Sequence, residues 1–344
     1  MDALILIGGF GTRLRPLTFT TAKNILPIAN KSLLERIIES ITEYVDRIIL
    51  SMGYKSCEMK ERLDKTLKEE YKKKLIYVEE KKPLGTLGAI KFSEEYLSSE
   101  FLVLNGDVLS DVDFDAFLAF HRRHNPKASI VLAKVEDPTR FGVAVLSGSK
   151  IVDFVEKPEN PISYWINAGV YLLKKELLKS VAKDTYTMIE RDLFPALSKE
   201  GSIYGYLHDS FWIDTGTPKT YIQANTYYQE KEDSGKFTLP FNIGNRVIKV
   251  KNMKIGPYVS IGKNCRLNCI EISHSIVFDN VTTEEGCIIK YSTIGYDTRI
   301  EAHTLIKKSI IGDNVVIRDN VHVENSKVCP HLTIKEDVFD SIRL

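Results

Sequence analysis

The 344-residue chain lacks the cysteine pairs that would indicate a disulfide framework or a zinc site. Its five cysteines are odd in number and contain no C-x-x-C pair, which argues for reduced thiols. It also lacks an excess of charge, because 47 Lys plus Arg residues stand against 46 Asp plus Glu residues for a net charge of +1. No global electrostatic field therefore favours nucleic acid or an anionic membrane, and any anion site must be local.

Long hydrophobic runs are missing as well. The N-terminal run DALILI is too short to span a bilayer, and it has neither a basic segment before it nor a cleavage site after it. We therefore expect a soluble cytoplasmic protein with no membrane and no nucleic-acid partner. The length is large for one domain and suits two.

Strand-like and helix-like runs alternate over the first two thirds of the chain. DALILI and residues 75–78, 101–105 and 128–133 have the pattern of strands, and residues 32–45 have that of a helix. This alternation predicts the α/β class, with a Rossmann-like, mostly parallel sheet covered by helices. Charges, Gly and Pro in EKEDSGKFTLPFNIGN (230–245) then break the pattern. We expect two domains, residues 1–232 and 246–344.

A six-residue period follows that break. Hexads that start with an aliphatic residue, often followed by Gly, begin at 255, 261, 267, 294, 300, 311, 317 and 323. This period cannot be an α-helical stripe, and it fits a left-handed parallel β-helix of hexapeptide repeats. The coil interior should hold Ile255, Ile261, Ile294, Ile300, Ile311 and Ile317. The terminal KEDVFDSIRL, with apolar residues at helical spacing, is expected to cap the coil or to pair with a partner.

A glycine cluster lies next to cations directly after the first strand, in GGFGTRLRPLT (8–18). Glycines at the C-terminal edge of a strand let backbone N–H groups approach phosphate oxygens. The dinucleotide fingerprint requires a third glycine where Leu14 stands, and the Gly-Lys-Ser/Thr of a P-loop does not follow. The segment is therefore neither of these loops, and by itself it is an ordinary turn between strand and helix with solvated arginines.

Eight motifs in order resemble those of sugar-1-phosphate nucleotidylyltransferases. They are GGFGTRLRPLT, Lys23, KPLGTLGA (82–89), LNGD (104–107), FGV (141–143), VEKP (155–158), NAG (167–169) and FWIDTGTP (211–218). With its hexapeptide tail the chain is most similar to the GDP-mannose pyrophosphorylase family, and the resemblance covers nearly the whole length. It implies nucleotidylyl transfer from GTP to mannose 1-phosphate. The alternatives are thymidylyl, uridylyl or adenylyl transfer to glucose 1-phosphate.

The resemblance also implies roles for individual residues. Arg13, Lys23 and Lys157 would be catalytic, and Asp107 and Asp214 would bind Mg²⁺, a hard cation that takes a few carboxylates together with phosphate oxygens. The nucleotide-binding set would be Leu6, Gly8, Gly9, Gly11, Thr12, Arg13, Lys23, Gly85, Thr86, Asn105 and Asp107. The sugar-phosphate set would be Gly142, Glu156, Lys157 and Asn167. One departure is that Ala22 and Asn24 flank Lys23, where the family usually has proline.

Two further classes of function stay open. A non-catalytic regulatory homologue would not need the motif cations and carboxylates that are present here. A second enzyme, an acyltransferase in the β-helix, would need a histidine base, for which the candidates are His274, His303, His322 and His331. The repeat region is short and has no long acceptor loop. We therefore expect it to assemble homo-oligomers and to carry no chemistry of its own.

Overall fold

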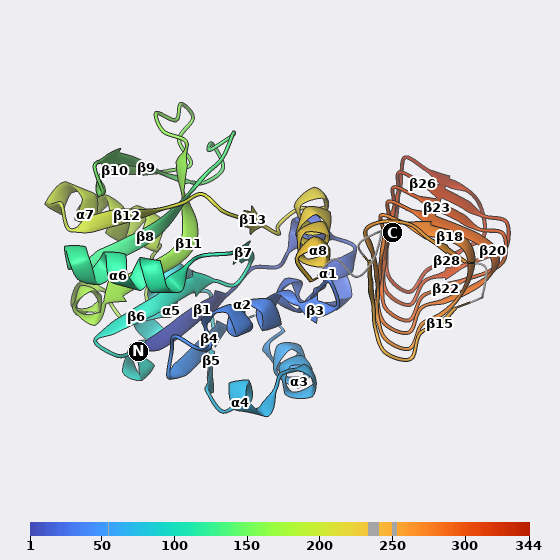
Figure 1. Ribbon diagram of the computed structural model, residues 1–344, viewed down its shortest axis with the longest axis horizontal. Helices are drawn as coiled ribbons and strands as arrows, with labels where there is room; N and C mark the ends of the chain where they lie inside the picture. The colour runs from blue at the N-terminus through green and yellow to red at the C-terminus, as the bar shows by residue number, and fades with distance from the viewer. Residues whose placement is uncertain (54, 233–240, 250–252) are drawn as a thin grey trace. The chain divides into compact units, whose positions relative to one another are not determined.

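The chain forms two compact units that interleave along the sequence (Figure 1). The computed structural model describes residues 1–53, 55–232, 241–249 and 253–344. Unit 1 consists of Met1–Gly9 and Leu34–Asp214, and unit 2 of Phe10–Leu33 and Thr215–Leu344. The segment Phe10–Leu33, which contains Gly11, Arg13 and Lys23, therefore belongs to the unit that contains the repeats, whereas Gly8 and Gly9 stay with the sheet. Residues 233–240 of the expected boundary segment lie outside the described residues.

Unit 1 is built on a nine-stranded mixed sheet. Its order is β5 (Leu75–Glu79), β4 (Arg47–Met52), β1 (Asp2–Ile7), β6 (Glu100–Asn105), β11 (Trp165–Lys174), β8 (Ala128–Lys134), β12 (Ile203–His208), β10 (Lys150–Glu156) and β9 (Gly142–Ser147). The first four of these strands are mutually parallel, as are β8 and β12, whereas β11 runs antiparallel to both its neighbours. A small sheet pairs β7 (Val108–Ser110) with β13 (Trp212–Asp214).

Helices cover this sheet, and the α/β expectation is confirmed. Unit 1 contains most of α2 (Leu33–Ile41), then α3 (Ser56–Thr66), α4 (Glu69–Lys72), α5 (Gly85–Phe92), α6 (Phe114–His124) and α7 (Phe194–Glu200). Shorter helical turns are η3 (Glu94–Tyr96), η4 (Lys175–Ser180) and the π-helix η5 (Ile189–Leu193). Helix α5 packs against β1, α6 against β12, and α7 against β10 and β12. The apolar strands are buried because helices lie against them.

Unit 2 begins with short elements that precede α2 in the sequence. They are η1 (Thr12–Leu14), α1 (Leu17–Thr20), η2 (Lys23–Ile25), β2 (Pro27–Ile28) and β3 (Lys31–Ser32). Helix α8 (Pro218–Glu232) packs against β2. The backbone N–H of Ala29 donates to Asn225 Oδ1 of α8 at 2.8 Å. A segment from near the N-terminus is thus held by a helix some 200 residues later in the chain.

The rest of unit 2 is a parallel β-helix whose successive turns stack in Figure 1. One sheet contains β14 (Phe241–Ile243), β17 (Val259–Ile261), β19 (Ile276–Val277), β21 (Thr293–Ile294), β24 (Ile310–Ile311), β27 (Lys327–Val328) and β30 (Ile342–Arg343). The other contains β15 (Ile248–Lys249), β16 (Lys254–Ile255), β18 (Arg266–Ser273), β20 (Thr282–Lys290), β22 (Arg299–Ile300), β23 (Leu305–Lys307), β25 (Val316–Ile317), β26 (His322–Glu324), β28 (Thr333–Ile334) and β29 (Val338–Phe339).

Aliphatic side chains fill the coil as the hexads predicted. Ile261, Ile294, Ile300, Ile311 and Ile317 are fully buried, and Ile255 is partly buried against the same core. A ladder of serines runs beside them, in which each Oγ accepts the backbone N–H of the serine one turn later, from Ser275 through Ser292, Ser309 and Ser326 to Ser341. The ladder satisfies polar backbone groups that the coil buries.

Sharp corners separate the sides of each turn. Many corner residues have positive φ, among them Asn264, Asn280, Asp297 and Asn314. Asn and Asp tolerate this left-handed conformation better than most residues. The side chains also form hydrogen bonds between turns, since Asn280 Nδ2 donates to Asp297 Oδ1 at 2.9 Å.

The terminal segment KEDVFDSIRL is not helical. It forms strands β29 and β30 of the last turn, with Val338 buried in the coil. Pairing with the preceding turn, Val323 with Val338 and Lys327 with Ile342, outweighs the local helical spacing. Among the described residues, no helix is both long and apolar enough to cross a membrane.

Candidate active site

The loop at the start of α5 fits closely against the segment before η5. The backbone N–H groups of Leu87 and Gly88 both donate to Thr187 O, at 3.1 and 3.3 Å. Gly85 has φ +73°, and a Cβ at this position would lie 2.4 Å from Thr187 O. Only glycine allows this approach of two backbones. The segment with Gly85 and Thr86, both predicted to bind the nucleotide, is therefore fixed in position by non-local hydrogen bonds.

Glu190 completes this corner of unit 1, and the sequence motifs did not point to it. Thr86 Oγ1 donates to Glu190 Oε2 at 2.7 Å and accepts from the Ile189 N–H at 2.9 Å. Burial raises the pKa of the Glu190 carboxyl, an effect that the Thr86 hydrogen bond opposes. Glu190 lies in the π-helix η5, a distortion that is frequent at functional sites. The one sequence signal is a run of three charged residues, Glu190 to Asp192, between apolar residues in MIERDLFP.

Two adjacent strand ends carry the predicted metal ligands. Asn105 ends β6 and lies opposite Leu6 of β1. Asp107 lies two residues further on, directly before β7. Strand β13 pairs with β7 so that Asp214 is opposite Val108. Asp107 therefore lies directly before one strand of this pair, and Asp214 ends the other. Among the described residues, no group of three or more His, Cys, Asp or Glu could hold a metal ion.

The predicted sugar-phosphate residues gather where β9 and β10 pair. Gly142 lies opposite Glu156, and a Cβ on this glycine would lie 2.5 Å from Phe154 Cζ and 3.0 Å from Glu156 Oε2. Lys157 has positive φ, and its Nζ is 2.6 Å from Glu156 Oε1. The Lys157 side chain is 57% exposed, whereas that of Glu156 is 13% exposed. The ammonium therefore remains accessible to an anion.

Asn167, on β11, is held by two hydrogen bonds. Its Nδ2 donates to the Tyr171 hydroxyl at 2.8 Å, and its Oδ1 accepts the Gly169 N–H at 2.9 Å. Burial raises the pKa of Tyr171 well above its usual value. Gly169 has φ +76°, and a Cβ there would lie 2.8 Å from Asn105 Nδ2. This irregular part of β11 thereby joins Asn167 to the strand end that carries Asn105.

The predicted phosphate-binding residues are divided between the units. Gly8 and Gly9 end the first segment of unit 1, and unit 2 contains Gly11, Thr12, Arg13 and Lys23. Gly11, with φ +60°, packs so closely that a Cβ would lie 3.2 Å from Lys23 Cβ. Its carbonyl accepts the Thr18 hydroxyl at 2.7 Å. Lys23 is only 7% exposed, on the turn η2.

Comparison with known proteins gives matches for both parts of the chain. The family model Nucleotidyl transferase matches residues 2–231, and GMPPB C-terminal domain matches residues 240–343. A mannose-1-phosphate guanyltransferase of Emericella nidulans is 33% identical over 359 residues, 98% of each chain. A mannose-1-phosphate guanylyltransferase catalytic subunit beta of Drosophila pseudoobscura pseudoobscura is 33% identical over 98% of this chain and 94% of its own. The crystal structure of HddC from Yersinia pseudotuberculosis has a TM-score of 0.58 at 30% identity, over 66% of this chain and 99% of that one.

Proposed function

The chain belongs to the nucleotidyl transferase family, and on that basis we propose that it transfers the guanylyl group of GTP to mannose 1-phosphate, forming GDP-mannose and pyrophosphate. One observation carries the choice of substrates. A relative named mannose-1-phosphate guanyltransferase matches 98% of the chain, so the likeness includes the β-helix as well as the sheet. The five free cysteines agree with a reducing compartment, and we assign the reaction to the cytoplasm.

The reaction is an in-line substitution at phosphorus. A phosphate oxygen of mannose 1-phosphate forms a bond to the α-phosphorus of GTP, the bond from that phosphorus to the bridging oxygen breaks, and pyrophosphate leaves with the electron pair. Both reactants are polyanions, so charge neutralisation and alignment provide most of the catalysis. Arg13 and Lys23 would bind the triphosphate and stabilise the departing pyrophosphate.

The sugar phosphate would bind at the β9–β10 pair. The exposed Lys157 ammonium suits the phosphate, and the Glu156 carboxylate suits sugar hydroxyls. A Cβ at Gly142 would collide with the Phe154 ring and approach Glu156 Oε2, so glycine at this position allows both side chains to keep their places. Asn167 would line the same pocket, with its amide oriented by Tyr171 and Gly169.

A divalent metal accompanies this chemistry in the family. Asp107, directly before β7, and Asp214, on the paired strand β13, fit such an ion, because Mg²⁺ uses one or two carboxylates and completes its coordination with water and substrate phosphates. We therefore assign Mg²⁺ to these two carboxylates. When bound, the ion would neutralise charge on the phosphates in the transition state.

A substrate panel tests the proposal. Pyrophosphate release would be measured with each nucleoside triphosphate against mannose 1-phosphate and glucose 1-phosphate, with Mg²⁺. GTP with mannose 1-phosphate should give the highest kcat/KM. A preference for glucose 1-phosphate would support one of the alternative transferases. No turnover with any pair would support a non-catalytic homologue and contradict the proposal.

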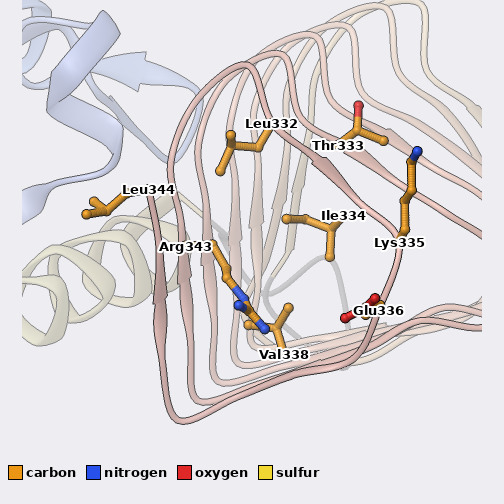
Figure 2. A pocket seen from close by; sticks show the side chains of 8 residues that line it. All are labelled: Leu332, Thr333, Ile334, Lys335, Glu336, Val338, Arg343 and Leu344. Carbon is orange, nitrogen blue, oxygen red and sulfur yellow. The ribbon is translucent and has the colours of Figure 1, made fainter.

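We also propose that the C-terminal end of the β-helix pairs with the same end of a second copy. The last strands of the coil surround a pocket of about 320 Å³, shown in Figure 2, whose lining includes Ile334 and Val338. The apolar Ile342 and Leu344 are 62% and 89% exposed here. Lys335, Glu336 and Arg343 supply both signs of charge, which suits a self-complementary contact. The buried Ser341 Oγ, the last rung of the serine ladder, has no hydrogen-bond partner among the described residues.

Light scattering on two variants tests this pairing. Ile342→Asp should lower the assembly mass. Ile270→Asp serves as a control, because Ile270 is 52% exposed elsewhere on the β-helix, and it should leave the mass unchanged. An unchanged mass for Ile342→Asp would exclude this end as the contact.

A further inference from the structure

Asp313 of the β-helix binds the segment that carries Lys23. Its Oδ2 accepts the Thr20 hydroxyl at 2.6 Å and the Thr21 hydroxyl at 3.3 Å. All of these residues belong to unit 2. Asp313 is 4% exposed, and burial raises the pKa of its carboxyl, while the threonine hydrogen bonds oppose that effect. Burying a carboxylate destabilises the folded protein unless hydrogen bonds compensate, so the threonine hydroxyls stabilise Asp313 in this position.

The two oxygens of Asp313 have separate partners. Oδ1 accepts the Tyr296 N–H at 2.9 Å, which closes a corner of the coil. Asp279, two turns earlier in the same column, accepts the Lys263 N–H through its own Oδ1 at 2.8 Å. The corner bond is thus a repeated feature of the β-helix. The hydrogen bonds from Thr20 and Thr21 to Oδ2 are different, because they join the β-helix to a segment outside it.

A second anchor holds the same segment on the far side of Lys23. Asn30 Nδ2 donates to Ile261 O at 2.9 Å, and Asn30 Oδ1 accepts the Ser260 hydroxyl at 3.2 Å. Lys23 lies between the two anchors and is itself buried. The backbone around the lysine is therefore fixed at both ends by β-helix residues.

We propose that Asp313 is a positioning residue for Lys23, and that the β-helix is thereby required for nucleotidylyl transfer as well as for assembly. This inference rests on the proposed function, in which Lys23 binds the departing pyrophosphate. It goes beyond the expectation from the repeats alone, which is that residues 246–344 assemble subunits and carry no chemistry of their own. A displacement of about 1 Å in a group that aligns reactants can lower the rate on the order of 100-fold.

Two sets of variants break the contact from opposite sides. Asp313→Asn keeps an oxygen for the Tyr296 N–H but replaces the oxygen that accepts from the threonines. The double variant Thr20→Val and Thr21→Val removes the donors and leaves the β-helix sequence intact. Asp297→Asn is the matched control, because it removes an exposed carboxylate from a neighbouring corner. Each variant should lose at least about 10-fold in kcat, with the KM for mannose 1-phosphate within about twofold, and the control should not.

A double-mutant cycle separates positioning from general stability. In a Lys23→Ala background, Asp313→Asn should cause no further loss, since the group that it positions is gone. A purely structural role would give the same loss in both backgrounds and would overturn the proposal. So would an unchanged kcat in Asp313→Asn and in the threonine double variant.

Amide hydrogen exchange supplies a readout that does not depend on turnover. Asp313→Asn should accelerate exchange in residues 18–26, and Asp297→Asn should not. If the wild-type protein showed no turnover with any substrate pair, the proposed function would fail. Faster exchange confined to Asp313→Asn would then still support the contact as the element that orders the lysine segment, and unchanged exchange would refute it.

Discussion

Two buried carboxylates outside the motifs, Glu190 and Asp313, connect segments with predicted site residues to distant parts of the same unit. Each accepts a hydrogen bond from a threonine hydroxyl, at 2.7 Å from Thr86 and 2.6 Å from Thr20. Burial raises the pKa of both carboxyls. Removing the threonine hydroxyl would leave the buried carboxylate without this hydrogen bond, which would destabilise the folded protein.

The metal assignment gives a prediction for a single residue. At saturating GTP, Asp214→Asn should lower kcat/KM for mannose 1-phosphate on the order of 100-fold or more, because a neutral amide is a weaker ligand for a hard cation. The Mg²⁺ concentration needed for half-maximal rate should rise as well. Steady-state assays over a Mg²⁺ titration measure both effects.

Asp209→Asn is the control for that variant, since Asp209 is exposed in the loop just before β13. Its Mg²⁺ dependence should equal that of the wild type. If Asp214→Asn also kept the wild-type Mg²⁺ dependence, Asp214 would not be a ligand.

The positions of Asp107 and Gly142 beside strand ends could be predicted, because the local sequence marks those strand ends. Asp107 follows an apolar strand, and Gly142 begins one. Glu190 and Asp313 could not be predicted, since their threonine partners are 104 and 293 positions away in sequence. The local sequence contains no information about such pairs, which form only when each unit folds.

At the scale of elements, the β-helix owes its regularity to columns of like residues. Cysteines take part in these columns, and Cys265, Cys269 and Cys287 are buried. Burial raises the pKa of the Cys265 and Cys287 thiols to about 11 and also raises that of Cys269. These thiols act as small apolar side chains within the coil.

Thiol labelling should therefore report the integrity of the coil. At pH 8, a thiol of pKa about 11 is only about 0.1% thiolate, the reactive form. We expect the exposed Cys57 to react first, and the three buried cysteines to react only after denaturant is added. Peptide mapping by mass spectrometry identifies each site. Rapid labelling of Cys265 or Cys287 in the native protein would contradict the buried coil.

Elements with a strong period were predictable, and the exceptions have clear physical causes. Residues 101–105 and 128–133 fall in β6 and β8, and the hexads fall in the coil. The helix expected over 32–45 is shorter, from Leu33 to Ile41. The terminal segment became strands because pairing with the preceding turn satisfies its backbone. The interleaving of the two units has no local signal at all.

At the scale of the whole molecule, stability should depend on pH through His121 of α6. This histidine is buried, with Nδ1 2.8 Å from Ser129 Oγ, and its Nε2 lies 3.8 Å from Glu100 Oε1. Burial lowers its pKa below 6.5, against the influence of Glu100. The unfolded chain therefore binds more protons between the folded pKa and 6.5. The stabilisation is complete above pH 6.5 and is lost as the pH falls below it, by up to about 1.4 kcal/mol per pH unit.

Urea unfolding of unit 1 between pH 7 and pH 5 measures this effect. His121→Gln should flatten the dependence of the free energy of unfolding on pH. His124→Gln, one helical turn away on the same helix and less buried, should retain the wild-type slope. An equal slope in His121→Gln would show that other groups cause the pH dependence.

The interleaved path of the chain also sets an order of events during synthesis. Residues 10–33 leave the ribosome early, but Asp313, which binds Thr20, is made 293 positions later. When the last strand of unit 1 has been synthesised, Asp313, which binds the segment around Lys23, has not yet been made. A chain that ends before the late turns of the coil would lack the Asp313 contacts that hold the segment around Lys23. With the roles proposed for Lys23 and Asp313, such an incomplete product would not turn over nucleotide, and the late turns of the coil would act as a check on the completeness of the enzyme.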